Sequence, residues 1–325
     1  MKPTPLMEIE SLRVEFAGSA GRRVRAVRDV DLTIYEGETL GLVGESGCGK
    51  STLGRAMVRV TEPTGGAIRY LGKDITKLRG TVFRKIRADL QMVFQDPFGS
   101  LNPRRSIADI VAEPLLRARG TGKDEARKIV DDLLDQVGLG REAGTRKPHE
   151  FSGGQRQRIG IARALAPSPR FVVADEPVSA LDVSIQAQVI NLLSDLIRER
   201  GLTMLFISHD LGVVRHIADR IAVMYLGQII EVASRDDFFA GPAHPYGEAL
   251  LSSVPALSKQ PRRDRIELTG ELPDPADPPA GCTFHTRCRY ATDVCRTDAP
   301  VLREVQPGRE VRCHLPLIPV KGSTS

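Results

Sequence analysis

The sequence contains no tryptophan, and aromatic residues make up only 5% of its 325 residues. Single-stranded nucleic acid is bound by basic grooves that carry stacking aromatic side chains. No such block is present, so the formal net charge of +5 is better explained by a solvated basic surface. No apolar run approaches the roughly 20 residues that span a bilayer. The first residues, MKPTPLMEIE, also lack the apolar core of a secretory signal. We therefore expect a protein that stays in the cytosol and does not itself cross a membrane.

The composition is that of a globular chain, with 41% hydrophobic and 27% charged residues. Its length exceeds what one small core needs. We expect two domains, residues 1–238 and residues 239–325, because the pattern changes near Phe239. Beyond that point a short helical segment lies between prolines, and the Pro-rich stretch ELPDPADPPAGC follows.

The first domain alternates short apolar runs with helical patterns, which predicts an α/β fold. The continuous runs TLGLVG, LQMVFQ, RFVVAD and TMLFIS are typical of strands covered on both faces. IAVMYLGQIIEVA predicts a hairpin around Leu226 and Gly227. Residues 9–37 predict a more exposed antiparallel sheet. Residues 97–165 predict a helical insertion, because SIADIVAEPLL and KDEARKIVDDLLDQVGL have three- and four-residue apolar spacing.

GESGCGKST fits the pattern G-x-x-x-x-G-K-[ST], and it lies between a predicted strand and a predicted helix. Such a loop curls its backbone amides around a polyphosphate. Lys50 is expected to reach the terminal phosphates, and the Ser51 hydroxyl to hold Mg²⁺. The predicted nucleotide-binding residues here are Gly44, Glu45, Ser46, Gly47, Cys48, Gly49, Lys50, Ser51 and Thr52.

Acidic and basic side chains follow two other predicted strands. Asp175 ends RFVVAD, where its carboxylate is placed to support the Mg²⁺ shell. Glu176 comes next and is the candidate general base for an attacking water. His209 follows LFIS and is placed to contact the γ-phosphate or hold the water.

FSGGQRQR sets two adjacent glycines before a segment of good helical composition. Bare amides at a helix N-terminus bind anions. A simple loop and helix cap would look the same, so these residues alone do not choose between the two.

The chain resembles the ATP-binding cassette (ABC) proteins. GESGCGKST, QMVFQD, FSGGQRQR, VVADEP, SALD and ISHD occur in the order and approximate spacing of that family, across residues 8 to about 235. The resemblance implies the α/β fold of an ABC ATPase, with a P-loop core sheet, an antiparallel β subdomain and a helical insertion. It also implies that two cassettes pack head to tail and share ATP.

The resemblance assigns further roles by position. The γ-phosphate of ATP held by the opposite subunit is expected to contact Ser152, Gly153, Gly154 and Gln155. Gln95 would join Mg²⁺ and the attacking water to the helical insertion, and Asp182 would communicate between the two sites. Phe151 replaces the more usual leucine and is expected to fill an apolar socket. The adenine-stacking aromatic has no clear match, which leaves Phe16, Arg22 and Arg23 as alternatives.

VFQDPFGSLNPRRSIADIVAEPLL, DEPVSALDVSIQAQVINLL and HPYGEALLSSVP are similar to the F-type ATPase subunit of bacterial dipeptide and oligopeptide importers. That similarity implies a D-type partner ATPase, two transmembrane permeases and an extracytoplasmic peptide-binding protein. It places the chain at the cytoplasmic face of the inner membrane, as a peripheral subunit. Importers of nickel or glutathione share much of the pattern and remain alternatives. A cassette ATPase acting on nucleic acid is disfavoured, because the cassette is not split by a long coiled coil.

Four of the five cysteines, Cys282, Cys288, Cys295 and Cys313, lie within 32 residues. Clustered cysteines in a cytosolic protein suggest a metal site. Zinc usually takes cysteines two to four residues apart, whereas these lie farther apart. We predict a [4Fe–4S] cluster, which tails of similar importer subunits hold, with zinc or free thiols as alternatives. The arginines expected to offset the cluster's charge are Arg287, Arg289, Arg296 and Arg312.

Overall fold

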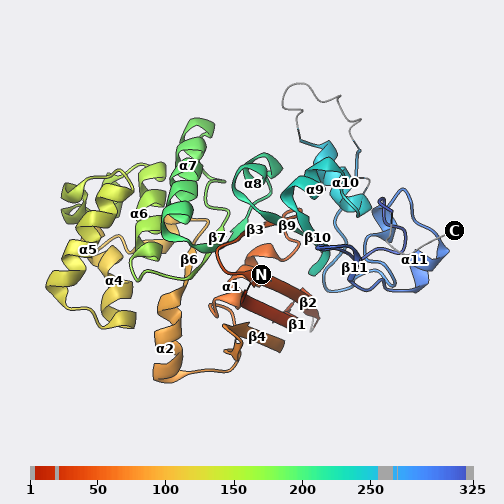
Figure 1. Ribbon diagram of the computed structural model, residues 1–325, viewed down its shortest axis with the longest axis horizontal. Coiled ribbons are helices and arrows are strands. Elements are labelled where there is room, and N and C mark those ends of the chain that lie inside the picture. The colour runs from red at the N-terminus through yellow and green to blue at the C-terminus, as the bar shows by residue number, and fades with distance from the viewer. Residues whose placement is uncertain (1–3, 19–21, 255–265, 269, 320–325) are drawn as a thin grey trace.

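The computed structural model describes residues 4–18, 22–254, 266–268 and 270–319. Figure 1 shows a helical region with α4 to α6 at one end, a central sheet, and the C-terminal region with α11 at the other end. The last residue of HPYGEALLSSVP lies outside the described residues, as do three residues of the region in which an adenine contact was sought. Among the described helices, none has the length and apolar character needed to span a membrane.

The central sheet has eight strands in the order β11-β12-β10-β9-β3-β8-β7-β6. Strands β3 (Thr39–Val43), β6 (Leu90–Val93), β7 (Phe171–Asp175) and β8 (Thr203–Ile207) run parallel. All four predicted apolar runs are therefore confirmed as strands. Strand β9 (Arg220–Tyr225) pairs parallel with β3 and antiparallel with β10 (Gln228–Ser234), which confirms the predicted hairpin.

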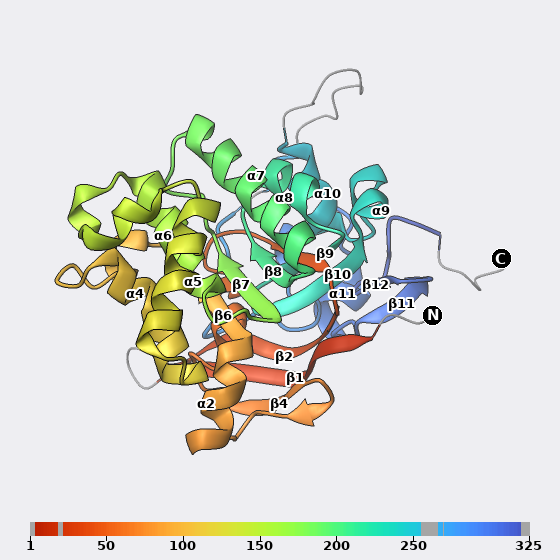
Figure 2. The ribbon, with the colours of Figure 1, turned by 60° about the vertical axis from the view of Figure 1, so that its left-hand side comes forward.

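The two faces of the sheet build two cores. Alternate residues of β7, such as Val172 and Val173, enter different clusters because successive strand side chains point to opposite faces. One cluster packs under helices α6 (Gly153–Leu165), α7 (Val183–Arg200) and α8 (Leu211–Ile217). The other packs under α1 (Lys50–Met57) and the N-terminal sheet. Figure 2 shows α7 and α8 on one side of the strands and β1 and β2 on the other.

The N-terminal sheet is antiparallel, as predicted, in the order β2-β1-β4-β5. Its strands are β1 (Pro5–Ala17), β2 (Arg23–Tyr35), β4 (Gly65–Tyr70) and β5 (Lys73–Asp74). Helix α2 (Gly80–Asp89) then leads into β6.

The helical region contains the two predicted helices. They are α4 (Ile107–Pro114), which Ser106 caps, and α5 (Lys123–Gln136). Pro114 ends α4, and a π-helical stretch, η2 (Leu115–Arg119), follows. The region also includes α3 (Pro97–Ser100), the 3₁₀ turns η3 (Arg141–Thr145) and η4 (Pro148–Glu150), and α6.

The C-terminal region joins the main sheet. After α9 (Arg235–Ala240) and α10 (Pro245–Ser252) come η5 (His285–Arg287), α11 (Asp293–Thr297), β11 (Arg303–Gln306) and β12 (Arg309–Val311). Strand β12 pairs antiparallel with β10, so the tail extends the sheet of the first domain. The Glu231 carboxylate in β10 is fully buried and accepts the backbone N–H groups of Ala243 and His244 and the guanidinium of Arg309. Its burial raises its pKa, and these three donors favour the charged form.

Candidate nucleotide site

The loop between β3 and α1 depends on glycine at two positions. At Gly49, φ is +109° and an added Cβ would lie 2.2 Å from the carbonyl oxygen of Ala26. At Gly44, an added Cβ would lie 2.2 Å from the carbonyl oxygen of Met224. The loop therefore passes between β2 and β9 with no room for a Cβ at these two positions.

A pocket of about 410 Å³ opens at this loop. It brings together residues that are far apart in the sequence, from Ala26 to His209, which are 183 positions apart. Its lining residues are Ala26, Ser46, Gly47, Gly49, Lys50, Ser51, Thr52, Gln95, Glu176 and His209. Two other predicted loop residues, Gly44 and Cys48, are buried. They belong to the loop but do not line the pocket.

Lys50 holds the loop closed on itself. The residue is 4% exposed, and its Nζ donates to the carbonyl oxygens of Gly44 at 2.8 Å and Glu45 at 2.9 Å. The ammonium therefore lies inside the curl of the loop, on the wall of the pocket. The positive charge of Lys50 and the N-terminus of α1 make this a site for an anion with several oxygens.

Ser51 and Asp175 form the predicted metal-binding pair. The Ser51 hydroxyl donates to Asp175 Oδ1 at 2.6 Å, and Arg55 lies 3.5 Å from Oδ2. Burial raises the pKa of Asp175, while the Ser51 and Arg55 contacts lower it. A hydroxyl and a carboxylate oxygen are ligands of the kind Mg²⁺ prefers, so the two residues fit this ion. Arg55 was missed from the sequence, although its place one helical turn after Ser51 puts both on the same face of α1.

The three predicted catalytic residues meet at one oxygen. Gln95 Nε2 donates to Glu176 Oε2 at 3.1 Å, and His209 Nδ1 lies 3.4 Å from the same atom. The three residues follow the ends of β6, β7 and β8, which are neighbours in the sheet. Glu176 has a φ of +44°, an uncommon conformation for a side chain of this size. Its backbone N–H donates to Ile207 O in β8, which holds it in that conformation.

The SGGQ segment begins helix α6 at a distance from this pocket. The Ser152 hydroxyl accepts from Gln155 N at 3.3 Å, and Gln155 Oε1 accepts from Ser152 N at 2.9 Å, which forms a capping box. Packing explains why position 154 is a glycine, because an added Cβ would lie 2.5 Å from Ile185 Cγ2. Of the described residues that line the phosphate-loop pocket, none belongs to SGGQ. Phe151 is buried, as expected of a socket-filling side chain.

Asp182 is the residue before α7 and is exposed, and its neighbour Val183 is 82% exposed. Of the three candidates for stacking on adenine, Phe16 is 45% exposed, Arg22 pairs with Asp274, and Arg23 pairs with Glu15. The adenine contact stays a prediction.

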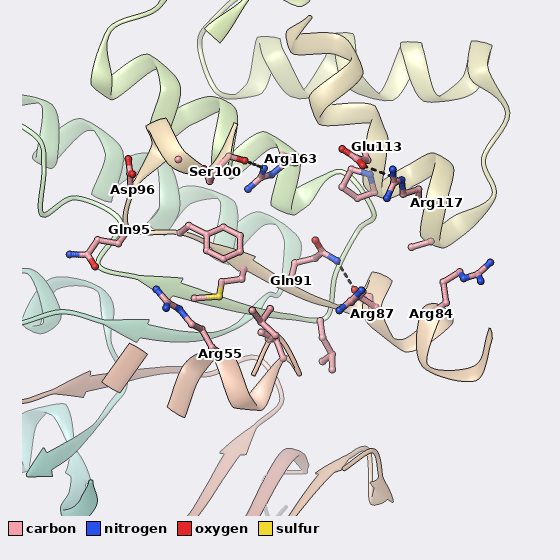
Figure 3. Close-up of a pocket in the computed structure, with 18 residues that line it drawn as sticks. Arg55, Arg84, Arg87, Gln91, Gln95, Asp96, Ser100, Glu113, Arg117 and Arg163 are labelled. Carbon is pink, nitrogen blue, oxygen red and sulfur yellow. Dashed lines mark hydrogen bonds and ion pairs between the residues drawn. The ribbon is translucent and has the colours of Figure 1, made fainter. Parts of the chain in front are cut away.

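A larger pocket of about 970 Å³ lies between α1, α2 and the helical region. Figure 3 shows arginines from several elements around it, among them Arg55, Arg87 and Arg163. Apolar side chains such as Met92 also line it. Gln95 lines both this pocket and the phosphate-loop pocket, so it connects the two.

The tail cysteines line a third, small pocket together with His285 and His314. All four are free thiols, and burial raises the pKa of Cys313 to about 12. Within the described ranges, however, no three His, Cys, Asp or Glu side chains are arranged so that they could hold a metal ion. The thiols thus share a pocket without the geometry of a ligand set.

Three of the arginines expected to offset a cluster's charge have other partners. Arg287 binds Glu45, Arg289 binds Glu248, and Arg312 donates to the carbonyl oxygens of Ile229 and Pro300. Charge compensation by these arginines stays a prediction.

Comparisons with known proteins agree with the geometry. The ABC transporter family model matches residues 27–179, and the model for the oligopeptide/dipeptide transporter C-terminal region matches residues 230–295. The chain is 52% identical to the putative oligopeptide transport ATP-binding protein YkfD of Bacillus subtilis, over 97% of each chain. It is 54% identical to the oligopeptide transport ATP-binding protein AppF of the same organism, over 90% of each chain.

The solved structures include a similar cassette. The dimeric, post-hydrolysis structure of the ATP-binding cassette MJ0796 bound to ADP and Pi matches with a TM-score of 0.64 and 31% identity. The match covers 70% of this chain and 98% of that one. The part of this chain that the match does not cover is similar in size to the C-terminal region, residues 239–325.

The close approach at Gly49 generates a testable prediction. Gly49→Ala should lower MgATP affinity at least tenfold, because its Cβ cannot fit beside Ala26 O. Gly37→Ala is the matched control, since φ is +78° there and nothing lies within 4 Å of the added Cβ. Binding of a fluorescent ATP analogue to the full chain measures both. Equal affinities for the two variants would show that the loop is not constrained in this way.

Proposed function

Because the chain belongs to the family of ATP-binding subunits of oligopeptide and dipeptide ABC transporters, we propose that its hydrolysis of ATP drives peptide import through partner permeases. The observation that carries the proposal is the pocket in which Gln95, Glu176 and His209 face the phosphate loop. A site that binds a polyphosphate and activates a water brings such groups together.

The phosphate loop supplies the binding. Loop amides and Lys50 surround the phosphates, and Lys50 exchanges its bonds to the loop carbonyls for phosphate oxygens. Ser51 and Asp175 would hold Mg²⁺, and Gln95 would reach the same shell. The bound ion would supply positive charge to offset that of the phosphates. The 2.6 Å contact between Ser51 and Asp175 supports this pairing.

Glu176 acts as the general base. Its carboxylate orients the attacking water and accepts a proton from it, while Gln95 and His209 fix the position of Oε2. Glu176 adopts a positive φ, and its side chain lines the pocket. His209, more than half exposed, is placed to contact the γ-phosphate.

The site is completed by a second cassette. SGGQ lies outside this chain's own phosphate pocket, so its helix N-terminus is available to a nucleotide held by another subunit. MJ0796, the similar cassette, is dimeric in its nucleotide-bound structure. Asp182, exposed beside Val183, would lie at the same interface and relate the two sites.

The large arginine-lined pocket is the proposed contact with the permeases. It lies beside the helical region, and Gln95 joins it to the catalytic pocket. If Gln95 moves when the nucleotide state changes, the shape of the pocket at the permease contact would therefore change as well. Binding of ATP closes the cassette pair, and hydrolysis reopens it.

The proposed assembly contains a D-type ATPase, two transmembrane permeases and an extracytoplasmic peptide-binding protein, and excludes nucleic acid. The chain would lie at the cytoplasmic face of the inner membrane. Its relatives YkfD and AppF carry oligopeptide transport in their names, which favours peptides over nickel or glutathione.

We also propose that the four tail cysteines hold a [4Fe–4S] cluster, with zinc as the alternative. Their common pocket supports the proposal, although the thiols must move closer together to bind it. His285 Nδ1 and His314 Nε2 contact backbone carbonyl oxygens, which leaves their other ring nitrogens for zinc. The cluster would stabilise the tail; no step of hydrolysis uses it.

The base assignment predicts the behaviour of Glu176→Gln. In a reconstituted transporter whose partner ATPase is inactivated, this variant should keep ATP affinity within about threefold and lose at least about 100-fold in turnover. Glu150→Gln, which alters an exposed carboxylate, is the control and should keep full turnover. Wild-type phosphate release by the Glu176 variant would remove the assignment.

The shared site predicts a different effect at Gly153. A side chain fits there, since an added Cβ would meet only Leu181 Cδ2 at 3.6 Å. Gly153→Asp should therefore leave ATP binding by the chain unchanged but abolish ATP-dependent association with the partner cassette, because its carboxylate repels the γ-phosphate. Gly153→Ala, without the charge, should associate nearly normally. Light scattering with and without ATP measures association, and normal association of the Asp variant would contradict a shared site.

The tail proposal predicts metal content. Chain purified without oxygen should be brown and carry about four iron atoms, as a [4Fe–4S] cluster requires. Cys288→Ser should lose the colour, whereas Cys48→Ser, at the buried fifth cysteine, should keep it. Colourless protein with one equivalent of zinc would establish the alternative.

A further inference from the structure

The phosphate loop is held from outside by residues of the C-terminal region. Glu45, its second residue, receives Arg287 through two hydrogen bonds: Nη1 to Oε2 at 2.6 Å and Nη2 to Oε1 at 3.0 Å. The Arg287 side chain is 6% exposed and that of Glu45 is 30% exposed. A two-pronged, largely buried arginine–carboxylate pair is among the stronger polar contacts in proteins.

Glu45 is also held through its backbone. The backbone N–H of Glu45 donates to the hydroxyl of Tyr246 at 2.8 Å, and its carbonyl oxygen accepts from Lys50. Glu45 is thus fixed at its side chain, its N–H and its carbonyl. Two of the three partners come from the region after residue 239.

An aromatic cluster sets these partners in place. Phe284, three residues before Arg287, packs edge-on against Tyr225 at a centroid distance of 5.2 Å and against Tyr246 at 5.4 Å. Tyr225 ends β9, next to Met224, whose carbonyl oxygen approaches Gly44. The tail therefore packs on the strand that already confines the loop, and Arg287 reaches the loop from there.

The pairing of Arg287 with the negatively charged Glu45 carboxylate affects nucleotide binding. An unpaired Glu45 carboxylate at the phosphate loop would repel the phosphates of ATP. Arg287 neutralises this carboxylate and withholds it from the phosphate side of the loop. Arg289, two residues on, points to a different partner, Glu248, and its side chain is 53% exposed.

We propose that Arg287 is a positioning residue for ATP binding, through which the cysteine-bearing tail holds the phosphate loop by way of Glu45. The inference rests on the proposed ATPase function and assigns the tail a part in it. A purely structural tail would leave nucleotide affinity unchanged when this one contact is removed.

The experiment compares variants of the full chain by equilibrium binding of a fluorescent ATP analogue with Mg²⁺. Arg287→Met should weaken binding about tenfold, because it leaves the Glu45 carboxylate unpaired beside the phosphates. Arg289→Met, in the same loop, should stay within about twofold of wild type. Adding Glu45→Gln to Arg287→Met should recover most of the loss, because the unpaired carboxylate is then gone.

Thermal unfolding of each variant checks that the chain is folded. If Arg287→Met does not fold, Arg287→Lys replaces it, with an expected loss of about threefold, and Arg289→Lys is its control. Equal affinities for the position 287 and 289 variants, or no recovery in the double variant, would overturn the inference. Failure of the wild-type chain to bind ATP would instead overturn the proposed function.

Discussion

Parallel pairing of β3, β7 and β8 is the constraint on which the site depends. Leu42 pairs with Ile207, and Ile207 pairs with Asp175, so the three strands end at one level of the sheet. The residues that follow these ends are therefore brought to one edge, although more than 30 positions separate each from the next along the chain. A shift of β7 by one residue would turn Asp175 to the opposite face and take it away from Ser51. The fully buried faces of these strands make such a shift costly.

The same edge imposes strain on single residues. The loop after β3 turns where backbone from β2 and β9 leaves no room for a Cβ, which explains Gly44 and Gly49. The turn after β7 instead places a glutamate at positive φ. A side chain tolerates that conformation only where neighbouring bonds enforce it, as the bond from its N–H to Ile207 O does here. The proposed catalytic geometry at Glu176 is thus supported by the adjacent strand.

Much of this arrangement is predictable from the sequence because it is local. Continuous apolar runs identify β3, β6, β7 and β8, and the polar residues after them identify the edge of the sheet at which the site forms. Contacts made across long separations are different. Nothing near Arg287 in the sequence indicates that it pairs with Glu45, 242 residues away, and its neighbouring cysteines suggested a metal-related role instead. Likewise, the division at residue 238 followed a change in composition, whereas the pairing of β12 with β10 depends on backbone hydrogen bonds that composition does not encode.

The C-terminal region is consequently joined to the rest of the chain at two places. At the sheet edge, Glu231 accepts bonds from Ala243, His244 and Arg309, so a buried charge ties β10 to the segment before α10 and to β12. Removing either partner of such a buried pair leaves an uncompensated charge, which is far more destabilising than the loss of a surface contact. At the loop, Arg287 and Tyr246 act on Glu45. The sheet-edge contacts keep the tail docked, and only a docked tail can present Arg287 to the phosphate loop, so nucleotide affinity depends on the first set of contacts through the second.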